Sequence, residues 1–393
     1  MSAPDDLKPL AGIRVLTLEQ FASAPYGSMF LADLGAEVIK VENAATGGDA
    51  ARYAGPYPLG PADSEYFQGW NFNKRSVALD LSSEDGRRAF EHLVGGAQAV
   101  MNNLRGDVPG KLGLDYAHLS AINPAIVCLH ISAYGRDNER ASRPGYDYLM
   151  QAEAGLMSLT GEPDRAPARF GTSTIDYMSG LTGVVGLLAC LMRAGQTGRG
   201  CDVDVSLFDV ALHQLNYVAT WYLNEGHVST RAERSAHFSV GPVQTYPTAD
   251  GWVYVMCMTD KFWNALVQGL ERHDLRTEPQ FATPELRCRH RHALSVQLDA
   301  EFAKHSTEHW LKTLGELLPI APVHALPQAL DSPFASSVGM IATVAHPLRP
   351  GLKVLGNPIR LNGRRLRQTV CSPLGGDDAD LLGPLAPQRG GAP

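Results

Sequence analysis

The sequence predicts an α/β protein built on a parallel sheet, and two observations lead to this fold class. Short β-rich runs alternate with helical patterns through the first half of the 393 residues. Strands separated by helices pair in parallel, and the helices then cover both faces of the sheet. At roughly 150 residues per domain, the chain is also long enough for two or three structural units. We therefore expect a large Rossmann-like domain together with a smaller one.

The first half of the chain supplies the expected sheet. The predicted strands are residues 13–18, 37–42, 76–81, 98–104 and 126–132. The predicted helices are residues 24–34, a segment that begins at 82–85 with hydroxyl and acidic side chains, and residues 116–121. Ligands of such sheets bind beyond the carboxyl ends of the strands, where the strand order reverses.

The second half is more helical and contains one irregular stretch. We expect a mostly helical segment at 146–193, a strand at 202–205 and one long amphipathic helix at 207–223. Residues 227–243 are polar and without periodicity, which is typical of a linker or an active-site loop. The expected organisation is a large domain at 1–223, this linker or loop at 224–245, a small α+β domain at 246–331, and a segment at 332–393 that returns to the large domain.

Composition and charge exclude several classes of protein. Hydrophobic residues make up 44% and charged residues 19%, which indicates a globular rather than a disordered chain. The net charge of -7 disfavours a general nucleic-acid binder. No secretory signal is visible, the most apolar run (181–192) is short for a membrane span, and the six cysteines are scattered. We expect a cytoplasmic protein without nucleic-acid or membrane partners.

The usual nucleotide and hydrolase motifs are absent from the sequence. There is no Gly-x-x-x-x-Gly-Lys phosphate loop, no Gly-x-Gly-x-x-Gly fingerprint and no Gly-x-Ser-x-Gly elbow. Two groups contain metal-binding residue types: Cys288, His290 and His292, and the pair His305 and His309. The first group alternates with arginines that would repel a cation, and the pair fits a solvated helix face. We expect no metal site.

Residues 170–180 are the segment most suited to covalent chemistry. Asp176 follows small hydroxyl residues and opens the most apolar helical run of the chain. One interpretation is a helix-capping carboxylate, which is common. The other is a carboxylate nucleophile, which requires desolvation and close access to an electrophilic carbonyl, and Gly171 and Gly180 would permit such access. The segment alone leaves both interpretations open.

Several motifs in order resemble class III CoA-transferases of the formyl-CoA transferase type. They include Leu-Ala-Asp-Leu-Gly-Ala-Glu-Val-Ile-Lys-Val-Glu at 31–42, Asn-x-Asn-Lys-Arg-Ser at 71–76, Gly-Lys-Leu-Gly-Leu at 110–114, Gly-Tyr-Asp at 145–147 and Thr-Gly-Arg-Gly at 197–200. The resemblance spans residues 8 to 215. It implies an interlocked homodimer and makes Asp176 the nucleophile. Its carboxylate would form a mixed anhydride with the acyl group of a CoA thioester, followed by an aspartyl-CoA thioester. CoA thioesters would be substrates, with no permanently bound cofactor.

The same resemblance implies a set of residues that contact CoA. These are Ala22, Ser23, Asn73, Lys74, Arg75, Leu79, Asp80, Leu81, Asn103, Leu104, Arg105, Lys111, Tyr146 and Asp147. The chain departs from the family pattern at two basic positions, which are Asn43 and Pro144 here. We expect Arg105 and Lys111 to be phosphate partners, because both side chains are cationic at neutral pH.

The expected acid substrate is a short dicarboxylate. Residues 236–242 replace the glycine-rich loop of the oxalate-using members, which disfavours oxalate as the acceptor. Arg52, Arg169, His237 and Ser239 are candidate partners for a distal carboxylate. Related α-methylacyl-CoA racemases place His where this chain has Tyr146, and a Tyr is a poor base at neutral pH, so transfer is favoured over racemisation. A non-catalytic acyl-CoA binding protein is the third alternative.

Overall fold

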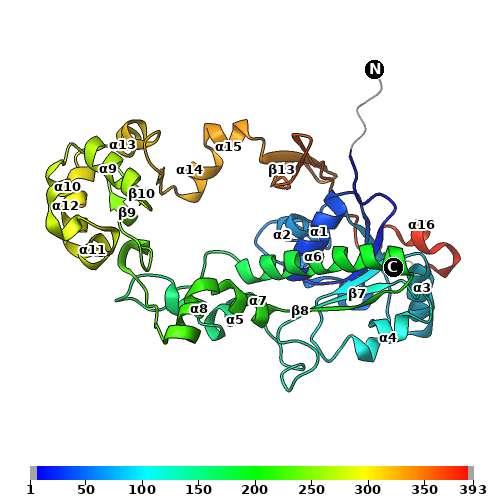
Figure 1. Ribbon diagram of the computed structural model, residues 1–393. Coiled ribbons are helices and arrows are strands. Elements are labelled where there is room, and N and C mark those ends of the chain that lie inside the picture. The colour runs from blue at the N-terminus through cyan, green and yellow to red at the C-terminus, as the bar shows by residue number, and fades with distance from the viewer. Residues whose placement is uncertain (1–6, 388–393) are drawn as a thin grey trace. The chain divides into compact units, whose positions relative to one another are not determined.

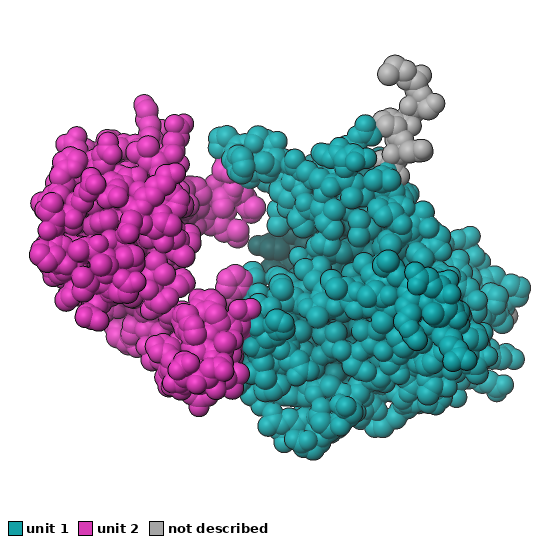
Figure 2. All heavy atoms as spheres, in the orientation of Figure 1, with its two compact units in different colours: residues 1–154, 171–214, 333–393 teal, residues 155–170, 215–332 magenta. Residues whose placement is uncertain are grey.

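The computed structural model describes residues 7–387 and divides the chain into two compact units (Figure 2). Unit 1 comprises residues 1–154, 171–214 and 333–393, and unit 2 comprises residues 155–170 and 215–332. The observed division differs from the expected one in that residues 155–170 belong with the small unit. The boundary after unit 1 also falls at residue 214, inside the segment expected to form a single helix.

Within the described residues, unit 1 contains a six-stranded parallel sheet, which confirms the α/β fold class (Figure 1). Its strands are β1 (Arg14–Leu18), β2 (Glu37–Glu42), β5 (Arg75–Ala78), β6 (Ala99–Asn102), β7 (Val127–Ser132) and β8 (Cys201–Ser206). Their order is β5-β2-β1-β6-β7-β8. The direction of chain progression therefore reverses between β1 and β6, and the carboxyl ends of these two strands flank the crevice in which sheets of this kind bind ligands.

Helices cover both faces of the sheet in unit 1. On one face, α1 (Ser23–Asp33) packs against α6 (Thr174–Thr197), and α6 also contacts β7 and β8. The other face buries Leu16, Ile39 and Val100 beneath α3 (Glu84–Gly95) and its neighbours. The remaining helices of unit 1 are α2 (Glu65–Asn71), α4 (Tyr116–Leu119), α5 (Asp147–Glu153), α7 (Leu207–Gln214), α15 (Pro333–Ser337) and α16 (Asp378–Leu382).

Helix α6 is longer and less buried than the sequence suggests. The expected helical segment at 146–193 is interrupted between α5 and α6, and α6 then runs for 24 residues. By length and composition alone, α6 could cross a membrane, a property that a core helix of a soluble protein shares. Its outward-facing side chains include Val185 and Met192, which are 69% and 71% exposed.

Unit 2 is built around a small antiparallel sheet. Its strands are β9 (Val243–Pro247), β10 (Trp252–Met256) and β11 (Ile320–Pro322), in the order β11-β10-β9. Its helices are α8 (Asn216–Glu225), α9 (Asp260–Gly269), α10 (Asp274–Thr277), α11 (Pro284–Arg289), α12 (Arg291–Phe302), α13 (Thr307–Leu314) and α14 (Leu326–Leu330). The single helix expected at 207–223 is wrong: it is divided into α7 and α8 at Asn216, whose φ of 44° is incompatible with a continuous helix.

The C-terminal segment is bound to unit 1 by hydrogen bonds to β5. The Asp377 carboxylate accepts a hydrogen bond from the Ser76 N–H at 2.9 Å, and the Asp378 carboxylate accepts one from the Ala78 N–H at 2.8 Å. Short antiparallel pairs complete unit 1: β3 (Pro58–Gly60) with β4 (Asp63–Ser64), β12 (Ile341–His346) with β13 (Arg349–Leu355), and β14 (Arg360–Leu361) with β15 (Arg364–Arg365).

Candidate active site

A cavity of about 250 Å³ lies at the carboxyl edge of the sheet, where the strand order reverses. It is lined by segments that follow β1 and β6, by the end of β7, and by Asp176 from the first turn of α6. The lining residues are Gln20, Phe21, Ala22, Ser23, Asn103, Leu104, Arg105, Ile131, Ser132, Ala133, Pro144, Gly145, Tyr146, Asp176 and Leu207. This is the position at which sheets of this topology bind their ligands.

The loop between β1 and α1 forms one wall of the cavity and has a strained backbone. Phe21 has a φ of 57°, which is uncommon for a residue that is not glycine. Two contacts hold the loop in this shape. The Phe21 N–H donates to the Asp49 carboxylate at 3.2 Å, and the Gln20 backbone exchanges hydrogen bonds of 2.9 and 2.7 Å with the Asn103 amide.

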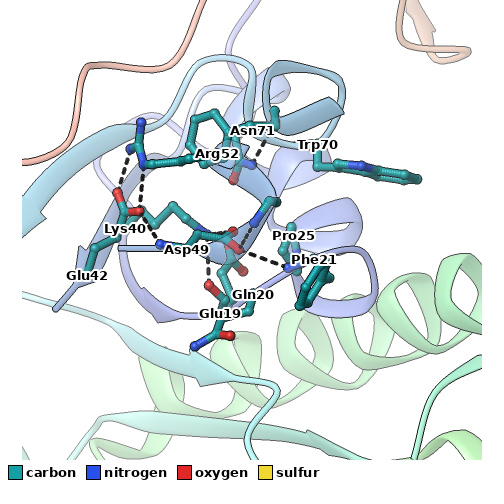
Figure 3. Close-up of polar contacts among 12 residues, drawn as sticks. Glu19, Gln20, Phe21, Pro25, Lys40, Glu42, Asp49, Arg52, Trp70 and Asn71 are labelled. Atoms are coloured by element: carbon teal, nitrogen blue, oxygen red, sulfur yellow. Dashed lines mark hydrogen bonds and ion pairs between the residues drawn. The ribbon is translucent and has the colours of Figure 1, made fainter. Parts of the chain in front are cut away.

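Beneath this loop lies a network of buried charges, drawn in Figure 3. The ion pairs are Lys40 with Asp49 at 2.9 Å, Arg52 with Glu42 at 2.6 Å, and Lys74 with Glu19 at 2.7 Å. The Lys40 ammonium also donates to the Glu19 carbonyl at 2.8 Å, and the Asp49 N–H donates to the Glu42 carboxylate at 3.0 Å. Because Asp49 also holds the Phe21 N–H, the network fixes the loop to the sheet from below.

The crossing of α1 and α6 places Asp176 beside this loop. A Cβ atom added at Gly180 would lie 2.3 Å from the Ser23 carbonyl oxygen, and one added at Gly27 would lie 2.5 Å from the Gly180 carbonyl oxygen. Only glycine at both positions permits this backbone approach. From the sequence, Gly180 is expected to give a substrate close access to Asp176. Its role in the structure is to bring the first turn of α6 against the start of α1.

Asp147, rather than Asp176, caps helix α6. The Asp147 carboxylate accepts hydrogen bonds from the Ile175 and Asp176 N–H groups at 2.6 and 3.0 Å, while Ser173 at the N-cap position makes no side-chain cap. Asp147 is itself buried and also accepts a hydrogen bond from Gln151. The cap that one interpretation assigned to Asp176 is therefore supplied by Asp147. The Asp176 side chain lines the cavity.

The environment of Asp176 changes its ionisation. Burial raises the pKa of the Asp176 carboxyl to about 7, and the nearby negative charge of Asp147 contributes in the same direction. A desolvated carboxylate of raised basicity at the end of a cavity is a strong oxygen nucleophile once it is deprotonated. The pKa of this group thus lies close to neutral pH, as the pKa of a catalytic group often does.

Six of the residues expected to contact CoA line the cavity with Asp176. They are Ala22, Ser23, Asn103, Leu104, Arg105 and Tyr146. Leu79, Asp80 and Leu81 follow β5 at the same edge of the sheet, where Leu79 is buried in the core. Lys111 lies beyond the cavity and pairs with Asp107 at 2.6 Å. Asp147 does not line the cavity, because its carboxylate is used in the α6 cap.

The basic residues of the motif at 71–76 do not line the cavity. Lys74 is fully enclosed and donates to Glu19 and to the carbonyls of Pro25 and Trp70. Arg75 begins β5 and pairs with Glu37 and with the C-terminal segment. These cations balance charges inside the protein, and their expected contacts with CoA stay a prediction.

Asn73 and Arg52 are also placed in structural roles. The Asn73 amide donates to Asp33 at 2.7 Å and lines a second cavity, of about 550 Å³, at the amino edge of the sheet. Arg52 is 1% exposed and held by Glu42, so its guanidinium is not available to a substrate carboxylate. Arg169, His237 and Ser239 belong to unit 2, and their role as partners of a distal carboxylate stays a prediction.

Sequence reasoning missed several residues of the site. Gln20, Phe21, Ile131, Ser132, Ala133 and Leu207 also line the cavity. A usable signal was present, because most of these residues follow or end a predicted strand, where ligands of parallel sheets bind. The role of Asp49 could not be found in this way, because it contacts Phe21, which lies 28 positions away in the sequence.

The described residues contain no group of three or more His, Cys, Asp or Glu side chains arranged to hold a metal ion. His305 and His309 stack with their ring centroids 4.1 Å apart in unit 2.

Around Asp176, the charged side chains of the cavity are Asp176 itself and Arg105. This lining fits chemistry at an acyl group, in which a carboxylate attacks a carbonyl carbon.

Comparison with known proteins agrees with this geometry. A model of CoA-transferase family III matches residues 10–379. The chain is 31% identical to succinate–glutarate CoA-transferase of Agrobacterium fabrum, covering 97% of both chains. It is 30% identical to acetyl-CoA:oxalate CoA-transferase of Acetobacter aceti, covering 90% of each. A crystal structure of a CAIB/BAIF family protein from Brucella suis superimposes with a TM-score of 0.83 at 32% identity, covering 96% of this chain and 99% of that one. The chain therefore belongs to CoA-transferase family III and is a CoA-transferase.

Proposed function

We propose that the enzyme transfers CoA from an acyl-CoA to a short dicarboxylic acid, with Asp176 as the covalent nucleophile. The observation that carries the proposal is the position of Asp176. Its side chain is partly buried, does not cap α6, and lines a cavity at the point where the strand order reverses. The substrate class is supported by the relatives, since each of the two names includes a dicarboxylate. Oxalate was disfavoured only because the glycine-rich loop is missing. Since one relative is named an acetyl-CoA:oxalate CoA-transferase, we do not exclude oxalate from the proposed substrates.

The proposed reaction proceeds in four balanced steps. The Asp176 carboxylate attacks the thioester carbonyl, the C–S bond breaks, and CoA leaves as a thiolate from a mixed anhydride. The thiolate then attacks the aspartyl carbonyl and releases the first acid. The second acid attacks the resulting aspartyl-CoA thioester, which forms a new anhydride and frees the thiolate. In the last step the thiolate attacks the new acyl carbonyl and regenerates Asp176.

The rest of the cavity would serve this chemistry by position and charge. Each step develops negative charge on a carbonyl oxygen, and donors fixed in advance stabilise such charge. The first turn of α1 begins at the cavity without a side-chain cap. Pro25 has no N–H and the Tyr26 N–H donates to the Ala22 carbonyl, so the N–H groups of Ser23 and Ala24 would serve this purpose. The buried ion-pair network holds that turn in place before the substrate binds.

The lining gives no support to racemisation. A racemase needs an acid and a base on opposite faces of the α-carbon. Tyr146 stands at the cavity, its ring edge-on to Phe21 with centroids 6.4 Å apart. Apart from Asp176, Arg105 and Tyr146, the described lining residues carry no ionisable side chain.

We also propose that the protein is a homodimer. The outer face of α6 exposes Val185 and Met192, and α8 exposes Leu223 at 78%. Apolar side chains in such numbers are typical of surfaces that another protein covers. A second copy of this chain is the partner that the family resemblance implies.

The test of the nucleophile is Asp176→Asn, assayed with succinyl-CoA and a panel of free dicarboxylates. We expect transfer to fall by several orders of magnitude, because an amide cannot form the anhydride. The folded state should survive the change and become more stable at pH 8. The raised pKa means that deprotonation opposes folding as the pH rises from about 4 to about 7, and Asn removes that effect. Transfer within tenfold of the native enzyme would refute the assignment.

A further inference from the structure

The cavity of about 550 Å³ at the amino edge of the sheet has no role in the chemistry proposed for Asp176. Its volume is within the roughly 300–1,000 Å³ of clefts that hold small organic ligands. The described residues that line it all belong to unit 1, and none of them also lines the cavity around Asp176. Residues just before β2 and β5 contribute to it, so the two cavities lie at opposite edges of the parallel sheet.

Four cationic side chains line this amino-edge cavity, although the chain as a whole has a net charge of -7. They are Lys8, Arg364, Arg365 and Arg367. Within residues 7–387, no ion pair joins any of the four to an Asp or Glu side chain. Arg365 donates to the Val338 and Asn357 carbonyls at 2.8 and 3.0 Å, which fixes its guanidinium without neutralising its charge. The cavity therefore has a strongly positive wall.

Local backbone geometry brings these cations together. β14 and β15 are joined by Asn362 and Gly363, whose φ values of 50° and 76° are those of a type I′ hairpin turn. This turn and the segment after it supply the three arginines. Lys8 comes from the other end of the chain. A Cβ atom added at Gly35 would lie 2.5 Å from the Lys8 Cβ, so glycine at this position lets Lys8 pack against the end of α1.

The protein does not use this positive charge for its own groups. Asp33 is the one carboxylate among the described lining residues, and it is 7% exposed. Its oxygens accept hydrogen bonds from the side-chain amides of Asn73, Asn357 and Gln368 at 2.7, 2.8 and 3.3 Å. The carbonyls at the end of α1 are also satisfied, since those of Leu31 and Ala32 accept backbone N–H groups. The cations remain available to a ligand.

We propose that the amino-edge cavity binds a small organic diphosphate of the nucleoside diphosphate class. Arginine forks match the oxygens of phosphate groups, and several cations in one wall suit a ligand with several negative charges. The volume exceeds that of a bare phosphate, and Ala36, Leu361 and Leu366 offer apolar contacts to the organic part. The ligand would occupy a site separate from that of the reacting thioester. The proposal does not depend on the identity of the acids that the enzyme uses.

The experiment is a calorimetric titration of the full-length protein with ADP. CoA also contains a diphosphate, so the titration is made with saturating CoA present, which fills the substrate site. We expect one ADP to bind per chain. Arg364→Gln and Arg367→Gln each remove one exposed cation of the wall and should each weaken binding by about tenfold or more. Inorganic pyrophosphate lacks the organic part and should bind more weakly than ADP.

The matched control is Arg88→Gln, which removes an exposed arginine that is paired with Asp85 on α3 and does not line the cavity. This control should leave the affinity for ADP unchanged. Absence of binding at millimolar ADP, or binding that the two cavity variants do not weaken, would overturn the proposal. An equal affinity for pyrophosphate would overturn the assignment to an organic diphosphate. Loss of ADP binding when CoA is added, or a tenfold rise in KM for succinyl-CoA in both variants, would show that the cavity serves CoA itself and would also overturn it.

Discussion

At the scale of single residues, the account depends on how Asp176 is placed. Burial raises the pKa of its carboxyl to about 7, so near neutral pH the free enzyme contains both the protonated form and the reactive carboxylate. Asp147 takes over the cap of α6 and leaves the Asp176 carboxylate to the cavity. Of two acidic residues 29 positions apart, one therefore caps the helix and the other is left for the proposed chemical role.

The pH dependence of kcat/KM reports this ionisation, because kcat/KM reflects the free enzyme. A protonated carboxyl is not a nucleophile, so kcat/KM for succinyl-CoA should rise with pH and level off above a midpoint near 7. Below the midpoint it should fall about tenfold per pH unit. Steady-state kinetics from pH 5 to 9, with enzyme stability checked at each pH, provide the measurement. A flat profile across pH 6 to 8 would contradict the placement of Asp176 in a desolvated site.

A second prediction at this scale concerns Asp49. Asp49→Asn keeps an acceptor for the Phe21 N–H but leaves the fully buried Lys40 ammonium without its nearest carboxylate. Breaking a buried ion pair in this way costs about 3–5 kcal/mol of unfolding free energy. Urea denaturation should show this loss, whereas Asp85→Asn, which breaks an exposed pair, should cost less than about 1 kcal/mol. Equal effects would mean that the network contributes no more than a surface pair.

At the scale of elements, the crossing of α1 and α6 positions the site. Gly180→Ala should force the two helices apart, because the added Cβ would lie 2.3 Å from the Ser23 carbonyl oxygen. We expect the variant to lose about 1–3 kcal/mol of stability and most of its transfer activity. Gly195→Ala on the same helix has nothing within 4 Å of its Cβ and should gain up to about 1 kcal/mol. Thermal unfolding and transfer assays on both variants test this, and comparable activities would refute the role of the crossing.

The sequence predicted the strands of the sheet well and one helix boundary poorly. The alternation of β-rich and helical runs located the strands of the sheet within a few residues, because buried parallel strands are continuous apolar runs. The break between α7 and α8 was missed, since Asn216 is not a strong helix breaker and its φ of 44° is set by tertiary context.

The candidate site was predicted less evenly than the fold. The family resemblance named Asp176 together with residues that follow β1 and β6, and these residues line one cavity in the structure. The partners of the basic side chains in the motif at 71–76 were not predicted. Lys74 stands just before β5, and its ion-pair partner Glu19 lies 55 positions earlier in the sequence. Local spacing does not reveal such a pairing.

At the scale of the whole molecule, the proposed dimer links stability to association. Chains that thread through one another cannot separate without unfolding. Light scattering should therefore give the mass of two chains down to the lowest working concentration, and dissociation in urea should coincide with the loss of circular dichroism. Replacing Val185 and Met192 with Lys should reduce soluble dimer, while Arg88→Gln should not. A folded, active monomer would contradict the dimer.

The central claim, that Asp176 becomes covalently acylated, is tested most directly by following oxygen atoms. In the proposed reaction, the acceptor acid attacks the aspartyl-CoA thioester, and its bridging oxygen remains on Asp176 when the thiolate removes the acyl group. Turnover with succinyl-CoA and a dicarboxylate labelled with heavy oxygen should therefore transfer label into the peptide that contains Asp176, as measured by mass spectrometry. No label should enter that position in Asp176→Asn. Multiple turnovers that leave the Asp176 peptide of the native enzyme unlabelled would contradict the account.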